Sequence, residues 1–326
     1  MTATVNSSKA YDLAGGALRE DLEDMIYDIS PMDTWFMTHA GRGRARSTTH
    51  EWLTDVLTAP GANAGVEGDA FSAQSRVLPA RLKNYTQISK KEFEVTGTAE
   101  ATNKAGMREL MAYHAARAAR ELKRDIEYNC LNANPASAGT STTARVSGSV
   151  PHWIYSGNHY KASSQTTVTT TAPVSGFATA SGASWAASNT AYVESDLKSM
   201  LQLAWSTGGE VDTVIMDSVT FNKFSSFTGI AQRFRNVTGS GNAADIIGYA
   251  DIYVSPFGKH QFVLSRYSMA NTAFCLQTDL WDIAYLRPFE TIPIAKVGDA
   301  ERRTILAEWT LVAKYPLGNS KAHGVT

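Results

Sequence analysis

The sequence has few of the residues from which covalent or catalytic chemistry is usually built. Among its 326 residues are 2 cysteines and 7 histidines, and the histidines are scattered singly. Cys130 belongs to a helical apolar stripe and Cys275 to the apolar run AFCL, so we expect two small buried side chains and neither a disulfide nor a metal pair. No stretch matches a phosphate-binding loop, a dinucleotide fingerprint, a nucleophile elbow or a paired-histidine zinc helix. We therefore predict no cofactor and no metal, and a protein that is not an enzyme.

Excess charge and long apolar runs are also absent. The chain has 30 lysine and arginine residues against 31 aspartate and glutamate residues, which gives a formal net charge of −1. A chain without net positive charge is not expected to bind nucleic acid tightly or to bind an anionic membrane. No apolar run approaches the roughly 20 residues of a membrane span, and the N-terminus lacks the order of a signal peptide. We expect a soluble protein that is made in a cytoplasm.

The most regular stretch runs from Asn103 to Asn134 and predicts one long helix. It is rich in alanine, leucine, arginine and glutamate and contains no proline. Arg117 with Glu121, and Lys123 with Glu127, stand one turn apart and would form weak ion pairs. At about 1.5 Å per residue such a helix would be roughly 45 Å long. Its apolar residues recur at spacings of three and four and form one narrow stripe: Met107, Met111, Ala115, Ala118, Leu122, Ile126 and Cys130.

An acidic segment precedes this helix near the N-terminus. Residues 1 to 17 are small and polar and suggest an arm that is ordered only by what it contacts. Residues 19 to 29, REDLEDMIYDI, predict a short helix with Leu22, Met25, Ile26 and Ile29 on one side. The acidic side chains mostly lie elsewhere on it: Glu20, Asp21, Glu23, Asp24 and Asp28. A solvated helix face is the more common explanation of such acids, and a docking surface is the alternative.

Residues 42 to 96 predict a long β-hairpin. Arg44 to Leu53 and Arg81 to Val95 have the character of strands, and the residues between them are rich in turn formers. Each arm of about 15 residues would reach roughly 50 Å. A two-stranded ribbon is marginally stable alone in water, so we expect it to lie on another surface. Arg42, Arg44 and Arg46 would point to the same side of the first strand, although arginines at a strand edge are often simply solvated.

The segment from Pro135 to Ala191 is dominated by serine, threonine, alanine and glycine, with Arg145 and Lys161 as its only charged residues. A disordered linker and an all-β elaboration are both compatible with this composition. The β elaboration is favoured by Trp153 to Tyr155 and by the alternating run QTTVTTT.

From Ser195 onward the pattern is that of an α/β unit followed by long strands. The expected elements are a helix capped by Ser195, a buried strand from Val211 to Met216, a helix capped by Ser218, a hairpin within residues 246 to 265, an extended run from Leu280 to Ile294 and a terminal hairpin turning at Gly298-Asp299.

Five sequence blocks carry a resemblance to a known family. They are REDLEDMIYDISPMDTWFM, HEWLTDVLTAPGANAGVEGD, RLKNYTQISKKEFEVTGTAEATNKAG, ELKRDIE and GDAERRTILAEWTLVAKY. These blocks, from about residue 18 to 315, resemble the SU10-like group of the HK97-type major capsid proteins of tailed phages. The resemblance implies an α+β, HK97-like fold. Its expected parts are an N-terminal arm with the acidic helix (1–41), an extended hairpin loop (42–98), a spine helix (99–134), a Ser/Thr-rich β elaboration or insertion of the peripheral domain (135–192), an α/β axial domain (193–280) and terminal strands returning to the peripheral domain (281–326).

The resemblance also implies a mechanical function. Such subunits self-assemble into hexamers and pentamers of an icosahedral head that encloses double-stranded DNA, in the virion capsid, after assembly in the cytoplasm of a bacterial host. The implied partners are other copies of the chain, a portal, a separate scaffolding protein, a cement protein and packaged DNA contacted without specificity, with no membrane partner. The residues agree with this function, because the hairpin and arm have little apolar partner surface of their own and a near-neutral wall releases DNA readily.

We expect the subunit interface to involve acids and arginines of the arm and hairpin. The candidate interface residues are Glu20, Asp21, Glu23, Asp24, Arg42, Arg44, Arg46, Trp52, Glu67 and Asp69. The main alternative is a virion decoration or tail protein whose Ser/Thr-rich β region binds glycans. A hydrolase is a third reading, and it would require a histidine and a carboxylate within about 3 Å in a cleft.

Overall fold

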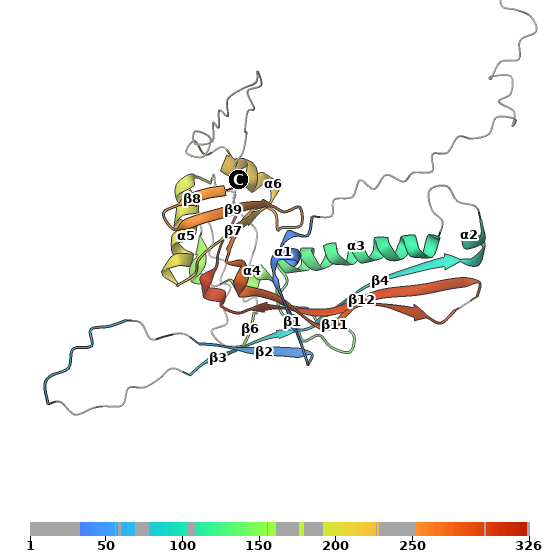
Figure 1. Cartoon of the computed structure of the whole chain (residues 1–326), viewed down its shortest axis with the longest axis horizontal. Coiled ribbons are helices and arrows are strands. Elements are labelled where there is room, and N and C mark those ends of the chain that lie inside the picture. Colours follow the sequence, from blue (N-terminus) through green and yellow to red (C-terminus); the bar gives the residue numbers. More distant parts are fainter. Residues whose placement is uncertain are drawn as a thin grey trace, which may run out of the picture.

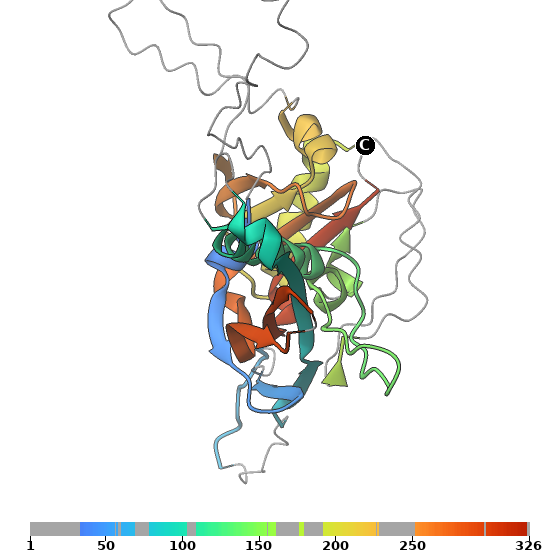
Figure 2. The same ribbon diagram turned by 90° about the vertical axis from the view of Figure 1, so that its right-hand side faces the viewer.

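The computed structural model describes residues 33–55, 57, 60–68, 78–102, 109–154, 156–160, 176–178, 192–225, 227, 252–296 and 298–324. Among them, a long helix lies along a narrow sheet, and a second sheet with its own helices stands at one end of this platform (Figures 1 and 2). The helices are α1 (Trp35–His39), α2 (Gly97–Ala101), α3 (Leu110–Leu131), α4 (Val150–Trp153), α5 (Glu194–Ser206) and α6 (Ser218–Ser225). The strands are β1 (Gly41–Arg44), β2 (Thr49–Thr54), β3 (Ala80–Tyr85), β4 (Gln87–Thr96), β5 (His159–Tyr160), β6 (Gly176–Phe177), β7 (Thr213–Met216), β8 (Ile252–Ser255), β9 (Gly258–Leu264), β10 (Thr272–Leu276), β11 (Trp281–Ile294), β12 (Ala300–Ala313) and β13 (Ser320–His323).

The platform is a four-stranded sheet in the order β1-β11-β12-β4. Its centre is the antiparallel pair β11 and β12, which turns through Gly298 at a φ of 76°, a conformation that glycine adopts without strain. This terminal hairpin and its turn are confirmed. The sheet is completed by β4, antiparallel to β12, and by β1, parallel to β11. Strands from both ends of the sequence thus build one sheet.

Helix α3 packs on one face of the platform through the predicted apolar stripe. Ala118, Leu122, Ile126 and Cys130 are buried, in one cluster with alternate residues of β12 such as Ile305 and Trp309. The predicted start of the helix is wrong. Glu109 has an extended backbone, and the helix of 22 residues, about 33 Å long, begins at Leu110. Residues 103–108, including the predicted stripe residue Met107, lie outside the described part of the chain.

The second unit is a six-stranded sheet in the order β5-β13-β10-β7-β9-β8. Met200 and Leu201 of α5 and Phe224 of α6 pack with residues of β7 and β9 in its own apolar cluster. The expected helix, buried strand, second helix and hairpin are all present. Their caps differ, because the Asp196 carboxylate accepts a hydrogen bond from Val193 N at 2.9 Å, and Asp217 accepts one from Thr220 N at 3.2 Å. The predicted caps, Ser195 and Ser218, are therefore wrong.

The predicted hairpin is shorter than expected. Its second arm divides at Thr86: β3 pairs with β2, whereas β4 pairs with β12 and belongs to the platform. At the other end, β1 pairs with β11. The prediction of two continuous arms of about 15 residues is wrong, because the outer ends of the segment pair with long platform strands: β1 with β11, and β4 with β12. What remains is a limb made of β2, β3 and the residues between them.

The Ser/Thr-rich segment is neither a linker nor an all-β unit where it is described. Residues 150–153 form α4, and Val150, Trp153 and Ile154 are buried in the platform cluster, so the extended structure expected from Trp153 to Tyr155 is wrong for its described part. Short strands β5 and β6 add parallel to β13 and β3. The run QTTVTTT lies outside the described residues.

Candidate subunit interface

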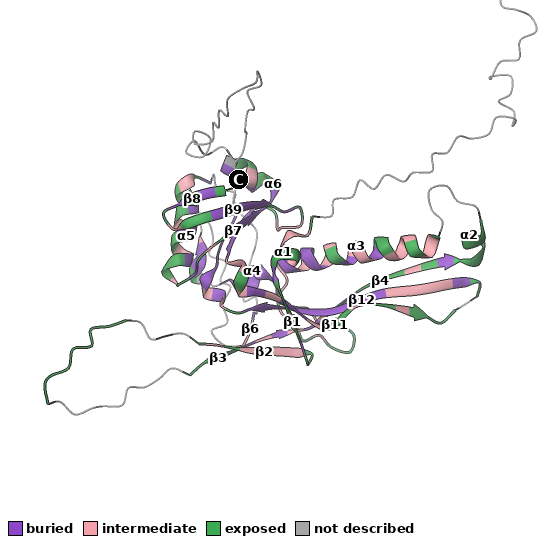
Figure 3. Ribbon diagram, in the orientation of Figure 1, coloured by how far each residue is buried: buried purple, intermediate pink, exposed green. Residues whose placement is uncertain are grey.

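The limb presents large apolar side chains to solvent. It leaves the platform at the base of β2 and β3, and its described residues are mostly exposed beyond that base (Figures 1 and 3). The exposed fractions are 66% for Leu53, 92% for Leu57, 78% for Val66 and 83% for Leu78. Several large apolar side chains exposed on one projecting element are typical of an interaction surface.

Trp52 fixes the base of the limb to its own subunit. Its indole Nε1 donates to the carbonyl of Ala313 at 2.9 Å, and its ring lies 5.3 Å from that of Trp153, measured between centroids. Trp52 is half-buried, so contacts within its own chain already cover much of the side-chain surface of this predicted interface residue.

Asn84 is a second fixed point, and nothing in the sequence pattern singles it out beyond its place in the block RLKNYTQIS. The side chain is fully buried. Its Nδ2 donates to Leu311 O at 2.6 Å, to Ser147 Oγ at 3.1 Å and to Gly148 O at 3.2 Å. Its Oδ1 accepts from Gly148 N at 2.8 Å and from Tyr85 N at 2.9 Å. One amide thus joins the limb, the segment after α3 and the platform.

The Glu308 carboxylate connects the same three regions through hydrogen bonds, two of them from arginines. This carboxylate, 4% exposed, accepts from Thr86 Oγ1 at 2.8 Å, Arg145 Nη2 at 2.7 Å and Arg287 Nε at 2.9 Å. Buried carboxylates require such compensation, because removal from water is costly. Arg145, one of two charged residues in its segment, is therefore a structural partner of the sheet.

The three predicted arginines lie exposed on or beside β1. The register places Arg42 opposite Ile283 and Arg44 opposite Tyr285, and these two β11 residues pack in the cluster beneath α3. Paired residues on neighbouring strands share a face, so Arg42 and Arg44 lie on the α3 side of the platform. Glu67 is exposed on the limb. The other predicted acids, Glu20, Asp21, Glu23, Asp24 and Asp69, lie outside the described residues.

Glu127 holds α1 against α3. Its Oε1 accepts from Phe36 N at 2.9 Å, and its Oε2 accepts from Met37 N at 2.7 Å. Burial raises the pKa of this carboxyl from 4.5 to about 7, and the nearby Asp33 adds to the rise, while the two backbone hydrogen bonds oppose it. The predicted pair with Lys123 is wrong, because Glu127 is buried beneath α1. The predicted pair of Arg117 with Glu121 is confirmed at 2.9 Å.

A buried basic cluster joins β13 to α4. The Lys321 ammonium is 1% exposed and donates to the carbonyls of Pro151 and Ile154. Burial lowers the pKa of Lys321 to about 7 and that of His152 to about 4, with the Lys321 charge adding to the shift of His152. His159 Nε2 lies 2.5 Å from His323 Nδ1. These groups connect the second unit to the platform core.

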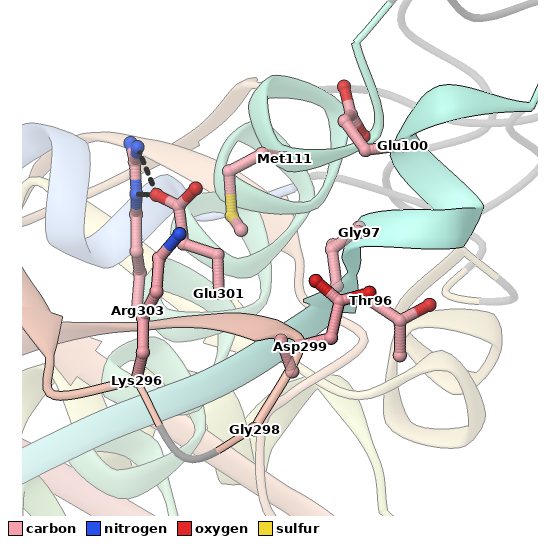
Figure 4. Close-up of a pocket in the computed structure, with 11 residues that line it drawn as sticks. Thr96, Gly97, Glu100, Met111, Lys296, Gly298, Asp299, Glu301 and Arg303 are labelled. Carbon is pink, nitrogen blue, oxygen red and sulfur yellow. Dashed lines mark hydrogen bonds and ion pairs between the residues drawn. The ribbon is translucent and has the colours of Figure 1, made fainter.

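A cavity of about 280 Å³ lies at the far end of the platform, between α2, the start of α3 and the turn of β11 and β12 (Figure 4). Its lining includes Glu100, Met111, Lys296, Asp299, Glu301 and Arg303. Arg303 and Glu301 pair at 2.6 Å, and the Asp299 carbonyl accepts from Gly97 N at 2.9 Å. None of the described residues that line this cavity is a histidine, serine or cysteine.

Among the described residues, no three histidine, cysteine, aspartate or glutamate side chains are grouped to hold a metal ion. Within the same ranges, no helix combines the length and apolar character needed to cross a bilayer.

Comparison with known proteins identifies the family. The whole chain, residues 1–326, matches the model of the SU10 major capsid protein family. The chain belongs to this family. It is 25% identical over 333 residues to the major capsid protein of Escherichia phage Phieco32, and the match covers 94% of each chain. The protein is therefore a structural major capsid protein that associates with itself in a virion capsid.

Solved capsid structures share its architecture. The capsid protein of a native GTA particle aligns with a TM-score of 0.62 at 10% identity over 99% of this chain and 100% of that one. Mycobacterium phage Bobi gives 0.61 at 11% identity over 98% and 99%, and the capsid of Cyanophage P-SCSP1u gives 0.60 at 10% over 98% and 96%. These likenesses confirm the predicted α+β, HK97-like fold. The family match does not favour the decoration or tail protein alternative.

Proposed function

We propose that this capsid protein forms the hexamers and pentamers of an icosahedral head enclosing double-stranded DNA, with the limb of each copy lying across an adjacent copy. The observation that supports this arrangement is the exposure of Leu53, Leu57, Val66 and Leu78 on an element that projects from its own platform. Burying a leucine side chain contributes about 2 kcal/mol, so covering two of them would supply roughly 4 kcal/mol per contact. In a closed shell, every copy of the chain would make this contact.

The proposed arrangement keeps the domain assignment made from the sequence with two changes. The projecting part of the 42–98 loop is confined to the limb, and β13, within the terminal segment 281–326, belongs to the six-stranded sheet of the proposed axial domain. Residues 1–41 form the arm, the region of α3 forms the spine, β1, β4, β11 and β12 build the peripheral platform and the unit around β7 forms the axial domain. The remaining partners are a portal, a separate scaffolding protein, a cement protein and DNA bound without specificity. Assembly takes place in the cytoplasm of a bacterial host, and the protein carries out no catalysis.

The arginines of β1 supply a second proposed contact. Arg42, Arg44 and Arg46 are exposed and form no ion pair with another residue that the structure describes. Their partners in the proposal are the acids around Glu20, Asp21, Glu23 and Asp24. Each exposed pair is worth at most about 1 kcal/mol, so the contact matters through its repetition in a shell.

The test is shell formation followed by electron microscopy of the purified protein. The double variant Leu57→Ser/Leu78→Ser should retain the unfolding free energy of the subunit to within about 0.5 kcal/mol, because both side chains are exposed. We expect its yield of closed shells to fall more than about tenfold, since the contact loses roughly 4 kcal/mol of apolar burial. Arg44→Glu/Arg46→Glu should likewise remain soluble but assemble poorly.

Val219→Ser on α6 is the matched control, because Val219 is 45% exposed and lies outside the limb. Undiminished shell yield from the leucine variant would refute the limb contact, and undiminished yield from the arginine variant would eliminate the charge contact. Discrete trimers or hexamers without closed particles from the wild type would instead indicate a decoration or tail protein.

A further inference from the structure

A further cavity, open to solvent and about 340 Å³ in volume, lies between β4 and the loop that follows α3. Its lining consists of one strand residue and six loop residues: Ile88, Ala138, Gly139, Thr140, Thr143, Ala144 and Arg145. Ile88 is paired with Glu308, whereas the next residue, Ser89, accepts a hydrogen bond from Trp309 in the cluster beneath α3. Neighbouring side chains of a strand point to opposite faces, so Ile88 and the cavity lie on the side of the platform away from α3.

The loop that lines the cavity is held in shape by its own hydrogen bonds. Ser137 and Val146 exchange two backbone hydrogen bonds, each of 3.0 Å, and Thr140 N donates to Thr143 O at 2.9 Å. Gly139 has a φ of 68°, and a Cβ at this position would lie 2.6 Å from Thr143 O, so the loop conformation depends on glycine here. Because this wall is already formed, a partner can bind to it without first ordering the loop.

Positive charge is in excess beside the cavity. The Glu308 carboxylate contacts Arg145 Nη2 at 2.7 Å and Arg287 Nε at 2.9 Å, so two guanidinium groups share one carboxylate. The two arginine side chains are 28% and 45% exposed, and an anion arriving from solvent can therefore reach them. Farther along the same face, charges are matched, since Lys90 pairs with Glu92 at 2.6 Å. The cavity thus combines apolar lining with an adjacent place for an anion.

The limb carries a pair of side chains that matches this combination. Val66 is 78% exposed, and the residue after it, Glu67, is also exposed. Among the four exposed apolar residues of the limb, Val66 is the only one that an acid directly follows. Glu67 and Gly68 form a turn, so both side chains stand at a bend of the chain. Val66 leaves the cavity of its own copy open, because the limb projects away from the platform (Figure 1).

We propose that the cavity receives the turn at Val66 and Glu67 from the limb of a second copy of the chain. In this contact the Val66 side chain packs against Ile88, and the Glu67 carboxylate pairs with Arg145. The inference rests on the proposed function, in which each limb lies across an adjacent copy, and adds the place where the limb binds. Since the limb and the cavity are different surfaces, each copy offers a limb to one neighbour and receives a limb from another. Contacts of this heterologous kind close into rings.

Cross-linking in assembled particles tests the contact directly. In Val66→Cys/Ala144→Cys both positions are exposed, whereas the native Cys130 and Cys275 are buried. A short bismaleimide should join assembled copies into a ladder of covalent oligomers on a denaturing gel and should leave unassembled subunits as monomers. Val66→Cys/Val219→Cys, which places the second cysteine on α6, is the control and should give no ladder.

The outcomes separate this inference from the proposed function. Closed particles in which the Val66→Cys/Ala144→Cys pair forms no cross-link would overturn the inference and leave the proposed function standing. A cross-link within an unassembled subunit would also overturn it, because the limb would then cover the cavity of its own copy. Assemblies smaller than a closed particle would contradict the proposed function, and the presence or absence of the ladder in them would still decide the contact. A chain that stays monomeric would overturn both.

Filling the cavity tests the apolar part of the contact. Ala144→Trp places a large side chain at an exposed position of the lining, so the unfolding midpoint of the unassembled subunit should stay unchanged. We expect the yield of closed shells to fall about tenfold, because Val66 loses its place of burial. Val219→Trp is the matched control and should leave the yield unchanged. An equal yield from Ala144→Trp and the wild type would overturn the inference.

A double-mutant cycle tests the charged part. Glu67→Gln and Arg145→Gln should each lower the shell yield about threefold, and the double variant should lower it no further than either single variant, because both remove the same pair. In Arg145→Gln, Glu308 keeps Thr86 and Arg287 as partners, so the subunit remains folded. Any structural effect of Arg145→Gln is common to both arms of the cycle. Independent, multiplying losses would overturn the pairing of Glu67 with Arg145.

Discussion

The platform and the limb are both built of paired strands, but the platform buries its large apolar side chains and the limb exposes them. In the platform, Trp281 and Trp309 are 0% and 1% exposed, because both pack in the apolar cluster that includes the buried face of α3. In the limb, Leu57 and Leu78 are 92% and 83% exposed. A surface of this kind is unfavourable in water unless another molecule covers it. The contrast separates what stabilises the subunit from what is available to join subunits.

The boundary between the two regions is sharp. β3 ends at Tyr85 and β4 begins at Gln87. Around this boundary, Asn84 and Thr86 are fully buried and hydrogen-bonded to β12, through Leu311 O and the Glu308 carboxylate. Polar side chains with several partners hold a defined geometry, because each partner loses a bond if the strand shifts. The limb therefore leaves the platform in a fixed direction.

The largest expected effect is on the platform side. Trp309→Ala should lower the unfolding free energy of the unassembled subunit by about 4 kcal/mol, since it leaves a cavity beside α3 and removes the indole hydrogen bond to Ser89. Denaturant unfolding measures the loss. Leu57→Ala on the limb is the comparison variant, expected to change that free energy by less than about 0.5 kcal/mol. Similar losses in the two variants would mean that the limb is as much a part of the subunit core as the platform.

An intermediate effect is expected at the boundary. Asn84→Ala should cost roughly 3 kcal/mol, because it leaves the buried amide of Gly148 and the carbonyl of Leu311 without this partner. It should also make the orientation of the limb relative to the platform less well defined, so that shell yield falls further than the loss of subunit stability alone explains. Subunit unfolding and shell yield, measured on the same preparation, distinguish the two consequences. A stable subunit with normal shell yield would show that Asn84 does not direct the limb.

The smallest effect concerns pH. The Glu127 carboxyl has a raised pKa of about 7 in the folded chain against an ordinary 4.5, so the native state holds more protons than the unfolded state between these values. Its contribution to stability is full below about pH 4.5 and is lost as the pH rises through 7. The stability of the wild type relative to Glu127→Gln should therefore fall by about 2 kcal/mol from pH 5 to 7. Unfolding curves of both proteins across that range provide the test, and a pH-independent difference would mean that Glu127 titrates normally.

Where a single repeat governs the structure, local sequence patterns predict it correctly. The stripe through Ala118, Leu122, Ile126 and Cys130 specified the buried face of α3, and the turn at Gly298-Asp299 specified the terminal hairpin of β11 and β12. Local patterns predict the wrong outcome at two positions. Glu109 is a helix-forming residue but has an extended backbone, and Glu127 is acidic but has its side chain buried beneath α1. The candidate interface could be predicted as a region but not in its extent, because the pattern of the second arm continues across Thr86 without a break.

By itself, the sequence determined the family, the helical and strand periodicities and the near-neutral charge, since each is a property of residues close together in the chain or of the whole composition. Only the tertiary structure decided that β1 and β4 belong to the platform, that Asn84 and Glu308 join three segments, and that Arg42 and Arg44 lie on the α3 side of the platform. Those outcomes depend on strand register and burial between residues as far apart as Asn84 and Leu311, and local patterns contain no information about which distant strand will pair.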